Sequence, residues 1–276
     1  MTNFISSFNN AHVKRLQLLI RSNQKRKKEG FFIIEGAKEI RAALLSGYQI
    51  ESVFICPTLC KDNDLYKLIK ELNQKISVFE ITKPIYENIA YRESTEGVMA
   101  ICAVKEHALE HLKLSKNPFV IVLEAVEKPG NLGAVLRTAD ACGADAVIVC
   151  DQVVDIYNTN VIRSSTGCVF YQQIATASSK ETIKWLKNNN FQICAATPLS
   201  NKNYTDINLC PAVAIVLGSE AKGLTKIWFN KADMLVKIPM LGKTDSLNVS
   251  ISAAVIAYEI VRQRFIKTSY TKPPSR

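Results

Sequence analysis

The chain has 276 residues, of which 47% are apolar and 22% are charged, and its formal net charge is +10. This length allows two ordinary domains, and the balance of apolar and charged residues excludes a largely disordered chain. No stretch approaches the roughly 20 apolar residues that span a bilayer, and the N-terminus lacks the pattern of a signal peptide. We therefore expect a cytoplasmic protein without a membrane segment.

The positive charge is concentrated at the two ends of the sequence. Residues 1–30 hold seven cations against the single acid Glu29, and a second basic run follows from Arg262 onward. One such run is ordinarily an exposed helix face, but two of them favour polyanion binding, because each phosphate contact releases condensed counterions. Charge alone does not separate RNA from DNA or from an acidic membrane. The candidate phosphate-binding residues are Lys14, Arg15, Arg21, Lys25, Arg26 and Lys27.

The chain has eight cysteines, most of them in or beside apolar runs, where a free thiol behaves as a small hydrophobic side chain. Cys56 and Cys60 are four residues apart, as are His107 and His111, and this spacing suggests zinc. The gap between the two pairs is much longer than the roughly 12 to 15 residues of a zinc finger, so we predict no metal site.

The first hundred residues alternate between helical and strand patterns. Val13, Leu16 and Ile20 predict an amphipathic helix with its cations on the other faces. Short apolar runs predict strands at 31–36, 53–56, 76–81 and 98–104, and helical patterns occupy 37–46, 64–73 and 85–90. A polar, charged stretch follows. We therefore predict a small α/β domain over 1–105 and a linker over 106–118.

From residue 119 the strands become near-continuous apolar runs, which is typical of parallel strands covered on both faces. Strands are predicted at 120–123, 146–149, 193–196 and 213–217, with helices at 132–142, 180–188, 225–231 and 249–264. The second domain, 119–276, is therefore predicted to contain a parallel α/β sheet, with ligands at the carboxyl ends of its strands. Neither a dinucleotide fingerprint nor a phosphate-binding P-loop follows these strands.

Three loops at strand ends hold the candidate chemistry. In the first, Asn131 is predicted to open a helix, as a cap or as a site residue, and Arg137 follows one and a half turns later. Taken alone, the ordinary interpretation of Arg137 is an ion pair with Asp140 or a neighbouring acid. In the second loop, Gly218 allows close approach to a ligand, and Glu220 either faces it or solvates the loop.

The third loop covers 238–248 and precedes a long apolar helix. Ser246 and Asn248 flank Leu247, so we expect their side chains to point the same way while Leu247 enters the core. Either polar residue can instead cap the helix that starts at Val249.

Together the three loops resemble the SpoU (TrmH) family of RNA 2′-O-ribose methyltransferases in the SPOUT superfamily. The matching motifs are N-L-G-A-V-L-R (131–137), L-G-S-E-A-K-G-L (217–224) and I-P-M-L-G-K-T-D-S-L-N-V-S (238–250). The resemblance covers 119–264, and F-I-I-E-G (32–36) is similar to the start of a small RNA-binding domain that many members have. Ser219 replaces a common Asn, Ala221 a common Gly, and Pro129-Gly130 a common Pro-His.

The resemblance implies a SPOUT domain with a deep trefoil knot, an exception to the rule that chains do not thread loops. It implies S-adenosylmethionine as the cofactor and a homodimer whose interface completes the site, with the helix from Val249 to Ile260 as a candidate interface element. The residues that would hold the cofactor are Thr197, Leu217, Gly218, Ile238, Met240 and Leu247.

The implied reaction is methylation of a ribose 2′-hydroxyl in structured RNA, with Arg137 as the activating residue. The pKa of a guanidinium is about 12 or higher, so Arg137 stays protonated at neutral pH. We therefore expect it to stabilise the developing oxyanion or to hold a phosphate rather than to act as a base. Asn131 and Glu220 would orient Arg137 or the ribose, and Ser246 and Asn248 would shape the hydroxyl pocket.

The separate N-terminal domain favours ribosomal RNA as the substrate, with transfer RNA as the alternative. Arg163 corresponds to a second arginine in some rRNA-directed members; it would bind RNA phosphate or form a structural ion pair. A non-catalytic RNA-binding or ribosome-assembly protein on the same fold is a further alternative. The presence of all five proposed catalytic side chains argues against this alternative.

Overall fold

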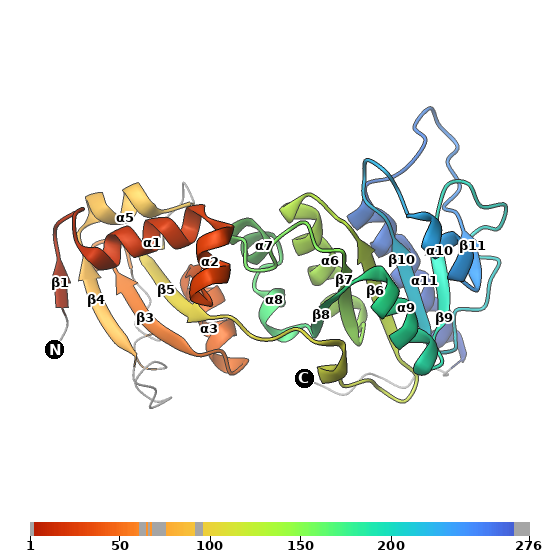
Figure 1. The fold of residues 1–276 in the computed structure, drawn as a ribbon, viewed down its shortest axis with the longest axis horizontal. Helices are drawn as coiled ribbons and strands as arrows, with labels where there is room; N and C mark the ends of the chain where they lie inside the picture. Colours follow the sequence, from red (N-terminus) through yellow and green to blue (C-terminus); the bar gives the residue numbers. More distant parts are fainter. Residues whose placement is uncertain (1–2, 61–64, 66, 68–75, 92–95, 268–276) are drawn as a thin grey trace. The chain divides into compact units, whose positions relative to one another are not determined.

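The computed structural model describes residues 3–60, 65, 67, 76–91 and 96–267, which form two compact units (Figure 1). The first unit comprises 1–106 together with 155–171, and the second comprises 107–154 and 172–276. The segment 155–171, which the sequence analysis assigns to the second domain, therefore belongs to the first compact unit. Within the described residues, no helix is long and apolar enough to cross a membrane.

The first unit is built on a mixed five-stranded sheet in the order β1-β4-β3-β5-β2. Strand β5 runs antiparallel to β2 and β3, whereas β4 runs parallel to β1 and β3. Four of these strands were predicted, and β1 is a three-residue strand without a sequence signal. The helix predicted at 64–73 lies largely outside the described residues. The strands are β1 (Asn3–Ile5), β2 (Phe31–Glu35), β3 (Ile50–Ile55), β4 (Ser77–Ile81) and β5 (Val98–Ala103).

Helices cover both faces of this sheet. The unit contains α1 (Ala11–Arg21), α2 (Asn23–Glu29), α3 (Ala37–Leu45), α5 (Lys83–Ile89), α7 (Thr159–Ser164) and α8 (Cys168–Tyr171). On one face α1 buries Val13 and Leu16 as predicted, but its third buried side chain is Leu19, and Ile20 is half-buried. An i, i+3, i+6 spacing thus forms the contact stripe of this short helix.

On the other face, Phe32 and Tyr48 meet two aromatic residues of the segment 155–171. The Phe32 and Tyr157 rings stack with centroids 4.0 Å apart, and Tyr48 meets Phe170 edge-on at 5.2 Å. All four side chains are buried. Burial of these large rings explains why α7 and α8 pack with the first unit, since aromatic side chains contribute strongly to core stability.

The second unit contains the predicted parallel sheet, but with six strands where the apolar runs predicted four, in the order β11-β9-β10-β6-β7-β8. The strands without a prediction are β8 and β11. The connection after β6 leads to β7 on one side, and the connection after β10 leads to β11 on the other side, which makes the β6–β10 boundary a topological switch point. The strands are β6 (Phe119–Glu124), β7 (Ala146–Cys150), β8 (Ile174–Ala177), β9 (Gln192–Ala196), β10 (Val213–Leu217) and β11 (Met234–Val236).

Helices α6 (Pro129–Cys142) and α11 (Val249–Lys267) pack together on one face of this sheet, and α9 (Ser179–Asn188) and α10 (Lys226–Lys231) cover the other (Figure 1). Alternating strand residues such as Val120 and Val122 join Trp228 in the core on the α9–α10 side. The predicted linker includes a short 3-10 helix, η1 (Leu109–His111). The fold is the expected α/β architecture, and the trefoil knot stays a prediction.

Candidate functional site

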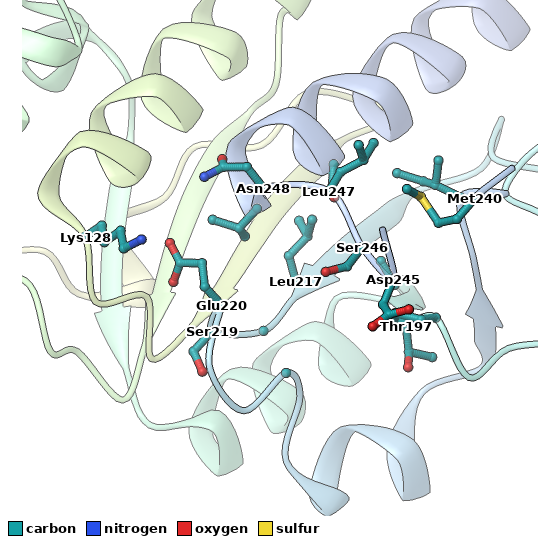
Figure 2. Close-up of a pocket in the computed structure, with 17 residues that line it drawn as sticks. Lys128, Thr197, Leu217, Ser219, Glu220, Met240, Asp245, Ser246, Leu247 and Asn248 are labelled. Carbon is teal, nitrogen blue, oxygen red and sulfur yellow. The ribbon is translucent and has the colours of Figure 1, made fainter. Parts of the chain in front are cut away.

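A pocket of about 460 Å³ lies at the carboxyl ends of the parallel strands of the second unit (Figure 2). Its wall is formed by the ends of β9 and β10, the loop after β10, the segment after β11 and the start of α11. This volume is within the range of small-molecule sites. All six residues predicted to hold the cofactor line the pocket: Thr197, Leu217, Gly218, Ile238, Met240 and Leu247.

Three predicted catalytic side chains form a chain of hydrogen bonds beside this pocket. The Asn131 side-chain amide donates to Glu220 and accepts, at 3.1 Å, a hydrogen bond from the Asn248 amide. Glu220 and Asn248 line the pocket. Residues from the first, second and third motif loops are therefore joined, although they are far apart in the sequence.

Asn131 does not open its helix. Helix α6 begins at Pro129 with Lys128 as its N-cap, so Asn131 lies within the first turn. Proline is favourable at this first position because its missing N–H has no partner in a helix. The interpretation of Asn131 as a cap is therefore wrong, and its side chain is used across the site instead.

Asn248 does cap α11, because its side-chain oxygen accepts from the Ser250 backbone N–H at 2.9 Å and from the Ser250 hydroxyl at 2.6 Å. Ser246 lines the pocket without capping this helix, and its backbone carbonyl accepts from the Thr244 hydroxyl. Leu247 is half-buried in the pocket wall, so the expectation that it enters the core is wrong.

The loop after β10 is closed very tightly at its base. A Cβ on Gly218 would lie 2.1 Å from the carbonyl carbon of Gly223, so only glycine fits there. Gly223 itself has a φ of 66°, and its N–H donates to the Ser219 carbonyl at 2.9 Å. The loop thus folds back on itself and presents Glu220 toward the pocket.

Two predicted catalytic residues, Asn131 and Arg137, do not line the pocket, and of these only Asn131 is hydrogen-bonded to residues that do. Arg137 lies on α6, its side chain is exposed, and it does not line the pocket of this chain. Arg137 lies six positions after Asn131, an offset that places the two side chains on different faces of α6. Within a single chain, Arg137 and the hydrogen-bonded group are therefore not in one place.

The sequence analysis missed two charged residues of the pocket wall, Lys128 and Asp245. Lys128 and Glu220 lie on one side of the pocket, while Asp245 lies on the opposite side near Thr197 (Figure 2). The lining contains one lysine against two carboxylates, so its charge favours a ligand with a cationic centre. Lys128 directly precedes Pro129 in the first motif loop, and Asp245 lies beside Ser246 within the third motif; these positions were the available signal.

The predicted phosphate-binding cations of the first unit differ in their availability. Arg26 is 5% exposed; it donates to Asp155 at 2.6 Å and to the Leu19 carbonyl at 2.7 Å. Its guanidinium is thus a structural link between α2 and the segment before α7, and the assignment of Arg26 to phosphate binding is wrong.

The remaining cations are closer to the surface. Arg15 is held by Glu29 and Glu51 at 2.8 and 2.5 Å, and Lys25 pairs with Glu29 at 2.9 Å. Four of the predicted phosphate-binding cations are exposed: Lys14, Arg21, Lys27 and Arg163. None of the four forms an ion pair with another residue that the structure describes. Arg163 lies on α7 and so shares the first unit with the other three.

Comparison with known protein families matches both parts of the chain. Residues 118–258 match the SpoU rRNA Methylase family, and residues 10–100 match an MRM3-like substrate binding domain. A relative from Staphylococcus epidermidis, a putative TrmH family tRNA/rRNA methyltransferase, is 32% identical over 241 residues, which are 84% of this chain and 96% of the relative.

Solved structures are similar over nearly the whole chain. One RNA 2′-O ribose methyltransferase has a TM-score of 0.82 and 38% identity, and the match covers 95% of this chain and 99% of the other. An rRNA methyltransferase from Sinorhizobium meliloti, solved with S-adenosylmethionine bound, has a TM-score of 0.85 and 26% identity, with coverage of 95% and 98%.

Proposed function

Because this chain belongs to the SpoU rRNA methylase family, we propose that it transfers a methyl group from S-adenosylmethionine to a ribose 2′-hydroxyl of structured RNA. One observation carries the proposal: six residues expected to hold the cofactor line the same pocket as Glu220, Ser246 and Asn248. The S. meliloti relative binds this cofactor, and one similar solved structure is a 2′-O ribose methyltransferase, which supports both the donor and the acceptor.

The pocket suits S-adenosylmethionine in size and in charge. When bound, the cofactor supplies a methyl group activated by a sulfonium cation. The apolar side chains of Leu217, Ile238 and Met240 can contact its adenosine and methionine carbon atoms, and the closed loop base at Gly218 brings backbone groups close. The carboxylates of Glu220 and Asp245 make the wall favourable to the positive charge.

The side chains of this chain position the reacting atoms. Methyl transfer to an alcohol is an in-line displacement, which depends on alignment. The hydrogen bonds that join Asn131 to Glu220 and Asn248 fix the polar wall on which the ribose hydroxyl would be oriented. Arg137 would then stabilise the developing 2′-oxyanion, or hold the neighbouring phosphate with its two-pronged guanidinium.

Because Arg137 does not line the pocket of its own chain, we propose that a second copy supplies it in a homodimer. Helices α6 and α11 pack side by side, and α11 leaves Ile251, Tyr258 and Phe265 about half exposed. An apolar face on the helix beside Arg137 supports an interface there, since large exposed apolar patches mark sites of association.

The substrate proposal is ribosomal RNA, with transfer RNA as the alternative. The match of 10–100 to a substrate binding domain supports recognition of a large RNA by the first unit. Lys14, Arg21, Lys27 and Arg163 are the exposed cations that we propose contact its phosphates. An RNA substrate also favours the cytoplasmic location expected from the sequence.

The test is transfer of labelled methyl groups from S-adenosylmethionine to total RNA from cells that lack this protein, followed by separation of rRNA and tRNA. We expect label in rRNA, at a position where the modified ribose resists alkaline cleavage. Label in tRNA instead would replace ribosomal RNA by transfer RNA as the proposed substrate. Bound cofactor and bound RNA without any transfer would support the non-catalytic RNA-binding alternative and overturn the enzyme proposal.

A further inference from the structure

Glu124 is a buried carboxylate of the second unit that the proposed chemistry does not use. It is the last residue of β6 and is 1% exposed. Ala125, the next residue, has a left-handed φ of 49°, so the chain turns sharply while the carboxylate stays inside. A buried carboxylate is stable only when hydrogen-bond donors surround it.

The donors come from two other elements. The Thr225 backbone N–H donates to Oε2 of Glu124 at 2.8 Å, and the Thr225 hydroxyl donates to Oε1 at 2.6 Å. The Ser179 hydroxyl, in the first turn of α9, lies 3.0 Å from the same Oε1 and 2.5 Å from Asp151. A serine hydroxyl has one proton, so Ser179 can donate to Glu124 or to Asp151 but not to both. The two donors of Thr225 have no such competing acceptor in this cluster and serve Glu124 alone.

Thr225 is the residue at which the loop after β10 ends. This loop starts at Gly218, which is pressed against Gly223 and Leu224, and Thr225 follows directly. Four of its residues, Gly218 to Glu220 and Gly223, line the pocket. Glu124 therefore holds the returning end of the loop against the end of β6, the strand that leads into α6 and Asn131.

We infer that Glu124 is a positioning residue, which anchors the pocket-lining loop at Thr225 and so fixes Glu220 opposite Asn131. This inference rests on the proposed function, because the loop lines the site assigned to S-adenosylmethionine. Both carboxylate oxygens are used, so the anchor restrains Thr225 in position and in rotation. The first and second motif loops are thus held together twice, at the pocket by Asn131 and Glu220 and beneath it by Glu124 and Thr225.

The same cluster offers a matched control. The Trp228 indole N–H donates to the Ser179 hydroxyl at 3.2 Å, so Trp228→Phe removes a buried hydrogen bond of the cluster while both hydrogen bonds from Thr225 to Glu124 stay in place. If Glu124 contributes only to general stability, Glu124→Gln and Trp228→Phe would act alike. If Glu124 positions the loop, only Glu124→Gln and Thr225→Val would change the site.

The test measures cofactor affinity by calorimetry, kcat and KM in the methyl-transfer assay, and thermal melting. We expect Glu124→Gln and Thr225→Val each to weaken S-adenosylmethionine binding by roughly ten- to a hundredfold, the loss expected for charge-assisted hydrogen bonds. The double variant should lose little more than the single ones, because both weaken the same contact between Glu124 and Thr225. Thr225→Ser, which keeps both donors, should restore binding, while Trp228→Phe lowers the melting temperature with affinity intact.

Hydrogen–deuterium exchange of the amides in 218–224 gives a readout that needs no cofactor. We expect faster exchange there in Glu124→Gln than in Trp228→Phe. Equal exchange in these two variants, or unchanged affinity in Glu124→Gln, would overturn the anchor. If the wild-type protein binds no S-adenosylmethionine, the proposed function fails, and the exchange comparison still decides whether Glu124 holds the loop.

Discussion

Two amide side chains, Asn248 in the pocket wall and Asn131 beside it, each use both their nitrogen and their oxygen. Asn131 donates to Glu220 while it accepts from Asn248, and Asn248 in turn accepts from Ser250 at the start of α11. Donor and acceptor are therefore fixed in each of these hydrogen bonds, from the cap of α11 at Asn248 to the carboxylate of Glu220. A carboxylate in place of either amide would reverse one donor into an acceptor.

Asn131→Asp should consequently damage the site more than Asn131→Ala does. The aspartate would place a second negative charge against Glu220 and would lose the donated hydrogen bond, a cost of roughly 1–3 kcal/mol. We expect kcat to fall in both variants and to fall further in Asn131→Asp. A kinetic comparison at saturating RNA and cofactor measures this, and equal kcat values would contradict the donor role.

Arg137→Lys should abolish most methyl transfer while cofactor affinity stays unchanged. The substitution keeps the positive charge but removes the planar fork that can hold a phosphate or an oxyanion with two donors. Cofactor affinity should not change, because the proposed contact of Arg137 is with the 2′-oxygen or the phosphate of the RNA and not with the cofactor. Calorimetry with S-adenosylmethionine and single-turnover kinetics separate the two effects, and near-normal turnover would refute the role.

Glu259 on α11 should make the stability of the second unit depend on pH. Hydrogen bonds from Arg262, reinforced by Gln263, hold the pKa of this carboxyl below its ordinary value of 4.5. Its stabilising contribution is therefore complete above that ordinary value and is lost as the pH falls through the lowered pKa. Glu259→Gln should cost about 1–2 kcal/mol at neutral pH.

Urea denaturation at about pH 7 and about pH 3 checks this. The difference in unfolding free energy between Glu259→Gln and the wild-type protein should be clear at the higher pH and should shrink at the lower one. A difference of the same size at both values would mean that the hydrogen bonds do not depend on the ionised form.

At the scale of the elements, the loop after β10 is the most constrained segment of the site. Gly218→Ala would place a Cβ within 2.1 Å of the Gly223 carbonyl carbon, so the loop must open. We expect weaker cofactor binding and a loss of stability of about 1–3 kcal/mol. Gly242→Ala is the matched control, because nothing lies within 4 Å of its added Cβ. Equal behaviour of the two variants in calorimetry and melting would contradict a closed loop.

The elements that the sequence predicts well are those whose own residues determine them. Strands β6 and β10 are uninterrupted apolar runs, and their pattern is visible without any partner. The strands β8 and β11, with three or four residues each, have no such signal and form only where a neighbouring strand offers hydrogen bonds.

The site is predictable to the extent that its residues lie in recognisable motifs. Thr197 and Met240 were assigned to the cofactor through the family resemblance, and they do line the pocket. Arg26 was misassigned because its burial depends on Asp155, which lies 129 residues away in the sequence. The helix start was predicted too late, at Asn131, since Pro129 takes the first helical position.

At the scale of the whole molecule, the net charge of +10 should make RNA affinity strongly salt-dependent. Replacing Lys14, Arg21 and Lys27 together by alanine should reduce the slope of log K against log salt by about 2–3, since each phosphate contact contributes about 0.7–0.9. The matched control replaces Lys180, Lys184 and Lys187 of α9. Filter binding at several salt concentrations checks this, and equal slopes for the two triple variants would refute the assignment.

The segment 155–171 belongs to the first unit, although 48 residues of the second unit, 107–154, precede it in the chain. On the ribosome, Phe32 and Tyr48 therefore emerge long before Tyr157 and Phe170, the rings that cover them. At about 5–20 residues per second, synthesis of 107–171 takes roughly 3–13 s, and the N-terminal unit stays incomplete until then. The start of the protein thus cannot finish folding first, and a nascent chain stalled before residue 155 would expose an aromatic surface to chaperones.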